Sequence, residues 1–438
     1  MAHLIARLKR FDLSDRLLRR HPLHYPRARR ELESFDRLDG EARRRWQHQR
    51  LRRLLEAAGR SEYGRQLGSP SYLGDWPILE KEAVREHPKS FLTGTAGWIT
   101  APASTSGTTG TPLSLRRSLP SIAFEQAVLD RLVGHMGVDP AGCRGAVLRG
   151  DDIRSPADRN PPFWRLANGG RRLIFSSNHL DAQTLGAFIA ALRDYAPQVL
   201  FAYPTVLDSL CTLMLERGLT LSVPVTVCGS EVLTRQTHEL ARRALGTRLV
   251  NYYGQAERVA WADGDPESGY RFLPSYGVVE LRFVESQGDG DVYDVIGTGL
   301  WNHAMPLVRY LTGDRVRLRP GASATEVEEG REIFLEILGR SGDYILSPSG
   351  ARLLGIDHIP RDVPHVVRAQ FIQESADAVT LLILPAPGFN DDCRRLLLEH
   401  ARLKLPPSMS LRIQTTDRLV RNHAGKAPLV IRHVNRSA

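Results

Sequence analysis

The chain has 438 residues, 42% of them hydrophobic and 25% charged, which predicts a globular protein with a substantial core and more than one domain. Lys and Arg outnumber Asp and Glu by 59 to 49, and the formal net charge of +10 favours an anionic ligand such as a nucleotide. A Cys-x-x-Cys zinc site and a disulfide framework are both excluded by the wide spacing of the four cysteines, Cys143, Cys211, Cys228 and Cys393. Because the N-terminus lacks a signal-peptide core and no apolar run reaches the ~20 residues of a membrane span, we expect a cytoplasmic protein that does not contact membranes.

The first 65 residues are rich in arginine and carry apolar residues at helical spacing, as at Leu51, Leu54 and Leu55. The run Arg43–Arg45 is compatible with nucleic-acid binding. Acidic residues are interleaved with these arginines and no aromatic stacking pattern accompanies them, which favours a solvated helix face and no nucleic-acid partner. A turn at 76–81 then leads into a short helix that ends near Glu86.

The segment from Ser104 to Pro112 reads Ser-Thr-Ser-Gly-Thr-Thr-Gly-Thr-Pro. Glycines allow such a loop to turn its N–H groups inward, and the hydroxyls add donors, so it could cradle a polyphosphate. The same composition also suits a solvated linker. Leu113 and Leu115 alternate with polar residues, which predicts that the loop joins two strands of a hairpin. It is not a P-loop, which needs Gly-Lys-Ser/Thr before a helix.

From residue 118 to 250, predicted strands and helices alternate, which indicates a mostly parallel sheet covered by helices. The strands are expected at 145–148, 173–175, 199–202, 223–228 and 248–251, and the helices at 121–135, 181–195, 204–216 and 234–245. Ligands bind such sheets at the carboxyl ends of the strands. Three loops are expected there, namely 203–205, 229–231 and 253–257.

The rest of the chain changes character. Short strands at 278–283, 291–296 and 316–318 suggest a small antiparallel sheet or barrel. The last 95 or so residues read β, β, α, β, at 366–373, 378–384, 391–404 and 411–415. The predicted fold class is therefore α/β. A large N-terminal domain, residues 1–339, combines the mostly parallel sheets with the small antiparallel sheet, and a small α+β domain, residues 340–438, follows a linker at 340–343.

The order of these motifs resembles that of the AMP-forming acyl- and aryl-acid ligases, the superfamily of acyl-CoA synthetases, adenylation domains and luciferases. The stretch Tyr-Gly-Gln-Ala-Glu-Arg at 253–258 is most similar to the phenylacetate–CoA ligase-like branch with its capsule-associated relatives. The resemblance implies ATP and Mg²⁺ as cofactors and activation of a carboxylic acid as acyl-AMP with release of pyrophosphate. It also implies transfer to an acceptor, which is the thiol of CoA, an acyl-carrier protein or an amine, and a mobile C-terminal domain.

The resemblance also assigns roles to residues. Glu257 would hold magnesium and act catalytically, Tyr253 would stack on adenine, and Lys426 would be the adenylation lysine of a C-terminal loop. Further contacts to the nucleotide are implied for Ser104, Thr105, Ser106, Gly107, Thr108, Thr109, Gly110, Gly229, Ser230, Glu231, Tyr252, Gly254, Asp314 and Arg340, with Thr108 also catalytic. The acid would lie against Phe201, Tyr203 and Tyr253, whose aromatic walls favour an aryl or short acyl acid. Phe201 could equally be plain core.

Three positions depart from the family pattern. Thr111 replaces a common phosphate-binding lysine, for which Arg116 or Arg117 would have to substitute. Ala256 replaces Thr or Ser, and Gly342 replaces an Asp or Lys hinge. Two other interpretations therefore stay open: a non-catalytic relative that binds nucleotide, and a basic nucleic-acid-binding protein.

Overall fold

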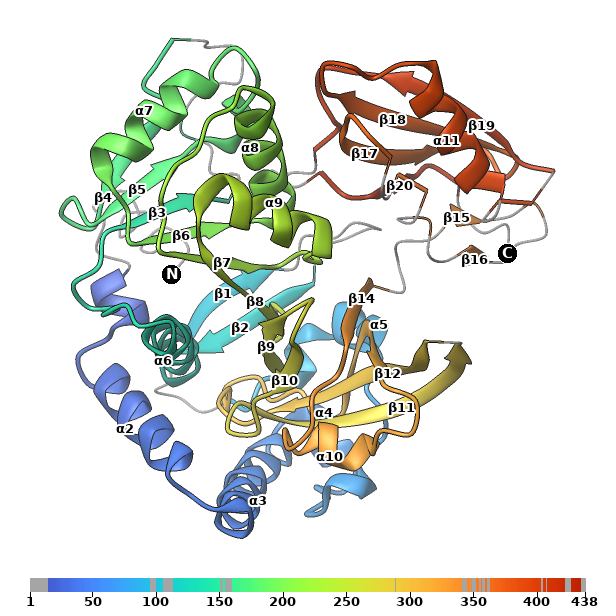
Figure 1. Ribbon diagram of the computed structural model, residues 1–438. Helices are drawn as coiled ribbons and strands as arrows, with labels where there is room; N and C mark the ends of the chain where they lie inside the picture. The colour runs from blue at the N-terminus through green and yellow to red at the C-terminus, as the bar shows by residue number, and fades with distance from the viewer. Residues whose placement is uncertain are drawn as a thin grey trace.

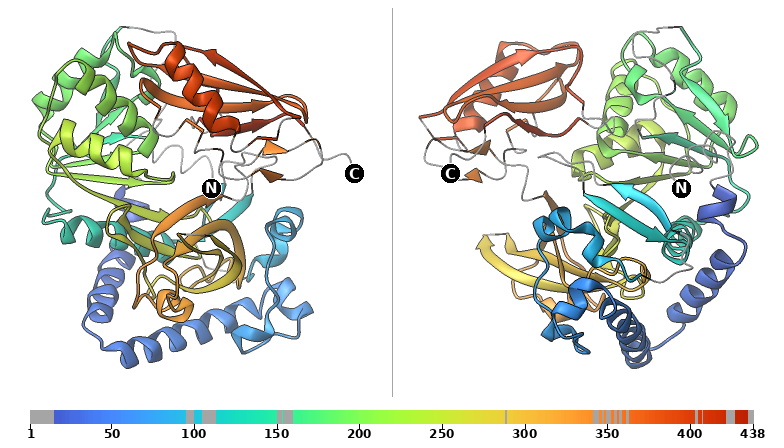
Figure 2. Two further views of the ribbon diagram at one scale, coloured as in Figure 1. Left: turned by 45° about the vertical axis from the view of Figure 1, so that its right-hand side comes forward. Right: turned by 180° about the vertical axis from the view of Figure 1, so that it is seen from behind.

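The computed structural model describes residues 15–94, 100–104, 113–149, 153, 160–287, 289–340, 345–346, 348, 352–353, 356, 359–360, 363–402, 405–406, 408–421 and 427–434. Figure 1 shows three bodies of structure: a large sheet with helices in green, a smaller sheet in yellow and orange below it, and a C-terminal sheet with one helix in red. The N-terminal helices, in blue, run along the lower side of the molecule, as both views of Figure 2 show.

The N-terminal region is helical, as its apolar spacing predicted. Its elements are η1 (Asp15–Arg19), α2 (His24–Asp36), α3 (Gly40–Ala58), α4 (Glu62–Gln66), η2 (Leu73–Asp75), α5 (Lys81–Glu86) and η3 (Pro88–Phe91). Asp39 begins α3 by accepting a hydrogen bond from Ala42 N at 2.7 Å. Residues Arg43–Arg45 lie on an exposed face of α3, which confirms the solvated helix face.

The predicted hairpin is confirmed. β1 (Thr100–Ser104) pairs antiparallel with β2 (Ser114–Ser118), and Ser104 lies opposite Ser114. The hydroxyl-rich loop between them, 105–112, lies outside the described residues. After β2 the chain enters α6 (Leu119–His135), where Ser118 accepts from Ser121 N.

The large sheet has eight strands in the order β10-β9-β8-β7-β6-β3-β5-β4. In chain order they are β3 (Gly145–Leu148), β4 (Trp164–Ala167), β5 (Arg172–Phe175), β6 (Val199–Ala202), β7 (Val225–Gly229), β8 (Arg248–Gly254), β9 (Trp261–Asp265) and β10 (Gly269–Phe272). The five central strands are parallel, as predicted. The antiparallel strands β4, β9 and β10 extend the sheet at its two edges and were not predicted.

Helices cover both faces of this sheet. One face carries α7 (Leu185–Tyr195), α8 (Pro204–Glu216) and α9 (Arg235–Leu245), and the other carries α6. Two boundaries differ from the prediction. α7 begins at Leu185 because Asp181 Oδ1 first accepts from Gln183 N and Thr184 N in a tight turn. β7 begins at Val225 because Pro224 has no N–H to donate to a neighbouring strand.

The two remaining sheets are smaller. The first is an antiparallel sheet of β11 (Gly277–Gln287), β12 (Gly290–Gly299), β13 (Tyr310–Leu318) and β14 (Glu336–Arg340), with α10 (Ala324–Glu328) beside it. The C-terminal region has β15 (Ile345–Leu346), β16 (Arg352–Leu353), β17 (Val366–Gln373), β18 (Ala378–Pro385), α11 (Asp391–Arg402), β19 (Ser410–Thr415) and β20 (Val430–Arg432). The predicted β, β, α, β order is confirmed, and β20, which was missed, joins β17 in parallel. The predicted linker overlaps 341–344, which lies outside the described residues.

Candidate active site

Glu257 lies in the loop that follows β8, at the carboxyl edge of the large sheet. Only 7% of its surface is exposed. Tyr310, the first residue of β13, donates its hydroxyl to Glu257 Oε1 at 2.8 Å, while Oε2 is buried and has no hydrogen-bond partner among the described residues. A buried carboxylate oxygen without a partner is costly unless a cation or donor reaches it. Glu257 therefore suits a hard cation such as Mg²⁺, which prefers oxygen ligands.

Arg117 ties the hairpin to this loop. From β2 it donates to the carbonyl oxygen of Ala256 through Nε at 3.0 Å and Nη2 at 2.6 Å. Burial, with the nearby charge of Arg258 next in importance, lowers the pKa of Arg117 to about 10, so it stays charged at neutral pH. Two donors of Arg117, one of the two arginines that could replace the lysine missing at Thr111, are thus occupied by the Ala256 carbonyl.

Tyr253 and Asp314 form a second buried pair. The Tyr253 hydroxyl donates to Asp314 Oδ2 at 2.8 Å, and the tyrosine ring packs edge-on against Phe272. Burial, and then the Asp314 carboxylate, raise the pKa of Tyr253, so the phenol keeps its proton and acts as a donor. Tyr253 thus positions the carboxylate expected to bind ribose. Its stacking on adenine stays a prediction.

Asp314 and Arg340 are neighbours across the small sheet. β13 pairs with β14 antiparallel, and Asp314 lies directly opposite Arg340. These two residues, both implied by the resemblance to contact the nucleotide, therefore share one end of one sheet, although 26 positions separate them in the sequence.

The segment Gly229–Glu231 leaves the carboxyl end of β7. Glu231 Oε2 accepts from Thr205 N at 3.0 Å and Thr205 Oγ1 at 2.6 Å, so it caps the N-terminus of α8. This confirms that Glu231 lies beside a helix N-terminus. Ser230 has a φ of 69°, a strained conformation for a residue with a side chain, and such strain is typical of functional loops.

Tyr252 is held rigidly beside this segment. Its ring stacks on Trp261 with centroids 4.6 Å apart and an interplanar angle of 4°. A Cβ at Gly229 would lie 2.5 Å from the Tyr252 ring, so only glycine allows the ring to cross the end of β7.

Two of the three aromatic residues expected to line the acid pocket, Phe201 and Tyr203, face different parts of the molecule. Phe201 packs with the cluster on the α6 side of the sheet, whereas Tyr203 packs with the cluster under α7, α8 and α9. Above Phe201 lies Arg149, the residue that follows β3, with its guanidinium carbon 5.5 Å from the ring centroid. Sequence reasoning missed Arg149, because one arginine after a short strand carries no motif.

Several predicted site residues cannot be placed. Lys426 and the hydroxyl-loop residues lie outside the described residues, the latter being Thr105, Ser106, Gly107, Thr108, Thr109 and Gly110. Ser104 is described and ends β1, exposed to solvent. Within the described chain, the structure therefore unites Glu257, Asp314 and Tyr253 at one edge.

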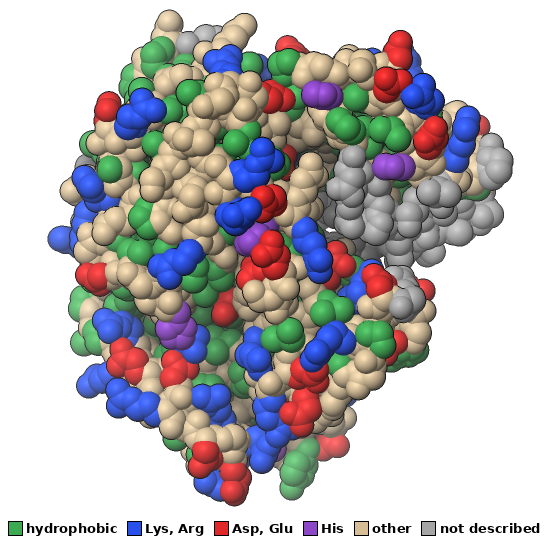
Figure 3. All heavy atoms as spheres, viewed as in Figure 1, with side chains coloured by type: hydrophobic (Ala, Val, Ile, Leu, Met, Phe, Trp, Pro, Cys, Tyr) green, Lys and Arg blue, Asp and Glu red, His purple; other side chains and the backbone are tan. Residues whose placement is uncertain are grey.

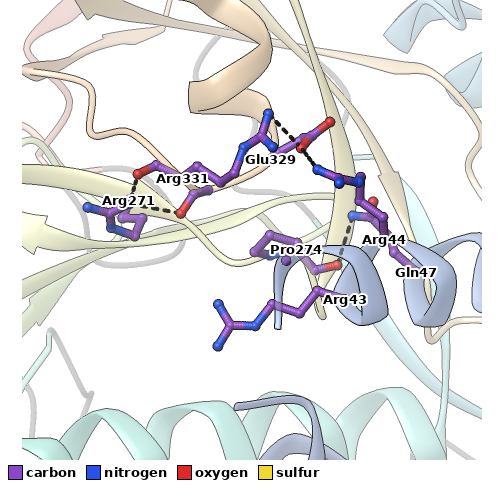
Figure 4. A pocket seen from close by; sticks show the side chains of 9 residues that line it. Arg43, Arg44, Gln47, Arg271, Pro274, Glu329 and Arg331 are labelled. Carbon is purple, nitrogen blue, oxygen red and sulfur yellow. Dashed lines mark hydrogen bonds and ion pairs between the residues drawn. The ribbon is translucent and has the colours of Figure 1, made fainter. Parts of the chain in front are cut away.

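A separate recess of about 400 Å³ lies beside α3. Figure 4 shows two of its arginines paired with one carboxylate: Glu329 contacts Arg44 at 3.4 Å and Arg331 at 3.0 Å. Arg271 donates to main-chain carbonyls there. On the one face that Figure 3 draws, basic and acidic side chains are interspersed over the lower part of the molecule, so this part of that face is not continuously basic.

Comparison with known proteins finds two family models that match this chain. Residues 160–287 match the AMP-binding enzyme family model, and residues 345–433 match the CapK C-terminal domain. These matches, together with the relatives, support a place in the superfamily of adenylate-forming ligases, on its phenylacetate–CoA ligase-like branch.

Among its relatives is protein CapK of Staphylococcus aureus, 21% identical over 82% of this chain and 80% of the relative. Another is phenylacetate-coenzyme A ligase of Thermus thermophilus, 26% identical over 73% and 70%. The crystal structure of 2-hydroxyisobutyryl-CoA ligase with 2-HIB-AMP covers 89% of each chain with a TM-score of 0.61 at 16% identity, which shows the shared fold. No helix in the described part of the chain is long and apolar enough to span a bilayer.

Proposed function

We propose that this protein activates a carboxylic acid with ATP, forming an acyl-adenylate and pyrophosphate, and then transfers the acyl group to an acceptor. The observation that carries the proposal is the buried Glu257 carboxylate, with one oxygen held by Tyr310 and the other without a partner among the described residues. The acceptor is a thiol, of CoA or an acyl-carrier protein, or an amine. Relatives named phenylacetate-coenzyme A ligase support a thiol.

The chain's own residues would mainly bind and orient. Asp314, held by Tyr253, would accept hydrogen bonds from the two ribose hydroxyls, because an ionised carboxylate offers two acceptor oxygens. Glu257 would hold Mg²⁺, which when bound neutralises negative charge on the phosphates. Adenylation needs little covalent chemistry from the protein, so this positioning accounts for most of the catalysis.

The hydroxyl-rich loop and Lys426 complete the proposed machinery. The loop, centred on Thr108, would donate hydrogen bonds to the leaving pyrophosphate. Lys426 would stabilise the charge that develops between the attacking carboxylate and the α-phosphate. Residues 340–438 would then rotate about the segment near Gly342 for the second step, since glycine readily absorbs a large backbone change.

An ATP–pyrophosphate exchange assay with a panel of carboxylic acids tests the proposal. At least one acid should support exchange in the presence of Mg²⁺, and adding CoA, a carrier protein or amines should then consume the adenylate. ATP binding without exchange for any acid would instead favour a non-catalytic nucleotide-binding relative. Retention on DNA or RNA that weakens with salt, without ATP binding, would favour the nucleic-acid alternative.

A further inference from the structure

Arg149 has a pair of donors that nothing in the described chain uses. Its Nε and Nη2 atoms are buried without a hydrogen-bond partner among the described residues, while Nη1 lies 3.5 Å from the Tyr252 hydroxyl. Buried polar groups in folded proteins are nearly always paired, because an unpaired donor loses its hydration without compensation. Two such donors on one guanidinium, at the ligand-binding edge of a parallel sheet, point to a ligand.

The identity of the two donors indicates what kind of ligand. Nε and Nη2 form the side of the guanidinium that matches the two oxygens of a carboxylate. The same pair holds carboxylates elsewhere in this chain. Arg20 contacts Asp130 through Nε at 3.1 Å and Nη2 at 2.7 Å, and Arg131 contacts Asp36 through Nε at 2.6 Å and Nη2 at 2.9 Å. Among the described residues, no carboxylate meets this fork of Arg149.

The fork is held in place by aromatic rings. The Arg149 guanidinium carbon lies 5.5 Å from the Phe201 centroid and 5.9 Å from that of Tyr252. Tyr252 is itself fixed between Trp261 and the bare backbone of Gly229. An arginine stacked on rigid rings loses little side-chain entropy when it binds an anion.

The surroundings of Arg149 are rich in positive charge. Arg258 is paired with Glu125, with Nε 3.0 Å from Oε2, which leaves that carboxylate committed. Arg19 is in contact with solvent, yet burial by the surrounding protein lowers its pKa. The charge of Asp15 raises this pKa, and the charges of Arg149 and Arg258 lower it. These neighbouring guanidinium charges favour an anion close to Arg149.

We infer that Arg149 recognises a second carboxylate on the acid, so that the substrate class is dicarboxylic acids rather than unsubstituted aryl or short acyl acids. The inference rests on the proposed function. One carboxylate would be presented for adenylation near Glu257, and the distal carboxylate would be held by Nε and Nη2 of Arg149. Nothing is covalently changed at the distal end. Phe201 contributes as the platform under Arg149, which gives it a role other than an aryl-binding wall.

The test measures kcat/KM in acid-dependent pyrophosphate exchange for the linear dicarboxylates from malonate to adipate, for their monomethyl esters and for phenylacetate. Methylation removes the distal charge and keeps the carbon chain. The preferred diacid should exceed its monoester by about 10- to 100-fold, the value of one or two charge-assisted hydrogen bonds. Arg149→Gln should lower the diacid to the level of the ester through KM. Arg149→Lys should fall between, because lysine keeps the charge but not the fork.

Arg172→Gln is the matched control. Arg172 also lies over Phe201, at 5.7 Å, but its Nη1 donates to the carbonyls of Cys143 and Arg171. This variant should keep the preference for the diacid. Equal kcat/KM for diacid and monoester in the wild type would overturn the inference. So would an Arg149→Gln variant whose KM rises for ATP and not for the acid, since the fork would then hold a nucleotide phosphate.

Calorimetric titration of the same diacids separates this inference from the proposed function. If no acid supports exchange but a diacid binds the wild type and not Arg149→Gln, the distal-carboxylate site stands and the ligase proposal fails. If exchange occurs and diacids show no advantage, the ligase proposal stands and the site fails. Absence of both exchange and diacid binding overturns both.

Discussion

Two groups of arginine side chains in this protein differ in whether they have partners: those that line the recess beside α3, and Arg149 at the carboxyl edge of the large sheet. Beside α3, Arg44 and Arg331 share the Glu329 carboxylate, and Arg271 donates to main-chain carbonyls. At the carboxyl edge of the large sheet, Arg149 has two buried donors that no described residue uses, and Glu257 has a buried oxygen in the same condition. The donors of Arg44, Arg271 and Arg331 named here have protein partners, whereas the sheet edge holds a donor pair and an acceptor without partners among the described residues.

The comparison shows that arginine side chains around a concave surface are not enough to define a binding site. A cavity lined by charges contributes little to binding when those charges already neutralise each other, because a ligand must first displace the existing partners. An unpaired buried group is different, because it has already lost its hydration when the protein folds. A ligand that pairs with it therefore adds little further desolvation free energy for that group. Variants at the two places should therefore behave differently.

The largest effect is expected for Lys426→Ala, which tests whether the sheet edge is the centre of the reaction. Removing one preorganised charge should slow adenylation by about 10²–10³-fold. Single-turnover formation of the adenylate is the measurement, with ATP affinity measured separately as the control. Unchanged pyrophosphate release would remove Lys426 from the mechanism and weaken the assignment of the whole edge.

Glu257→Gln tests the unpaired oxygen directly. The amide keeps the shape and an acceptor for Tyr310 but loses the negative charge, so the Mg²⁺ concentration for half-maximal exchange should rise by about 10- to 100-fold. Circular dichroism and thermal unfolding control for a damaged fold. A normal magnesium response would show that the orphaned oxygen of Glu257 holds no metal.

The contrast between these two groups of arginines also shows which features could be predicted from the sequence and which could not. Apolar runs bounded by Gly and Pro were enough to predict the five parallel strands and the hairpin at Ser104. The edge strand β4 was missed because Trp164–Ala167 is short and mostly unburied, and its pattern does not differ from a loop. Motif order gave Glu257 and Asp314 their expected roles, and the structure placed them on neighbouring elements.

Whether a charged group is paired could not be predicted from sequence. Arg44 is satisfied by Glu329, 285 positions away, and Tyr253 by Asp314, 61 positions away. Arg149 differs from Arg44 only in lacking such a partner in the described chain, and no local pattern records that difference. Pairing is set by the tertiary fold, so it becomes visible only in coordinates.

Gly229→Ala tests how tightly Gly229 packs against the Tyr252 ring, which lies beside Arg149. The new methyl group would lie 2.5 Å from the Tyr252 ring, so the ring must shift and the stack on Trp261 must loosen. We expect a loss of about 1–3 kcal/mol in the free energy of unfolding, as for other overpacked sites, with a raised KM for the acid. Urea unfolding followed by exchange kinetics measures both. Gly186→Ala, at a helical glycine with open space around it, is the control and should not destabilise the protein.

The smallest effect is expected for Glu329→Gln beside α3. The variant removes the carboxylate that Arg44 and Arg331 share, but both arginines are partly exposed and can be solvated instead, so the free energy of unfolding should change by no more than about 0.5 kcal/mol. Pyrophosphate exchange should be unchanged, while weak sulfate binding should appear because Arg44 loses its carboxylate partner; Arg331 keeps its ion pair with Glu326 at 2.7 Å. A loss of exchange as large as that of Glu257→Gln would contradict the comparison, since it would place the α3 recess in the reaction despite its paired charges.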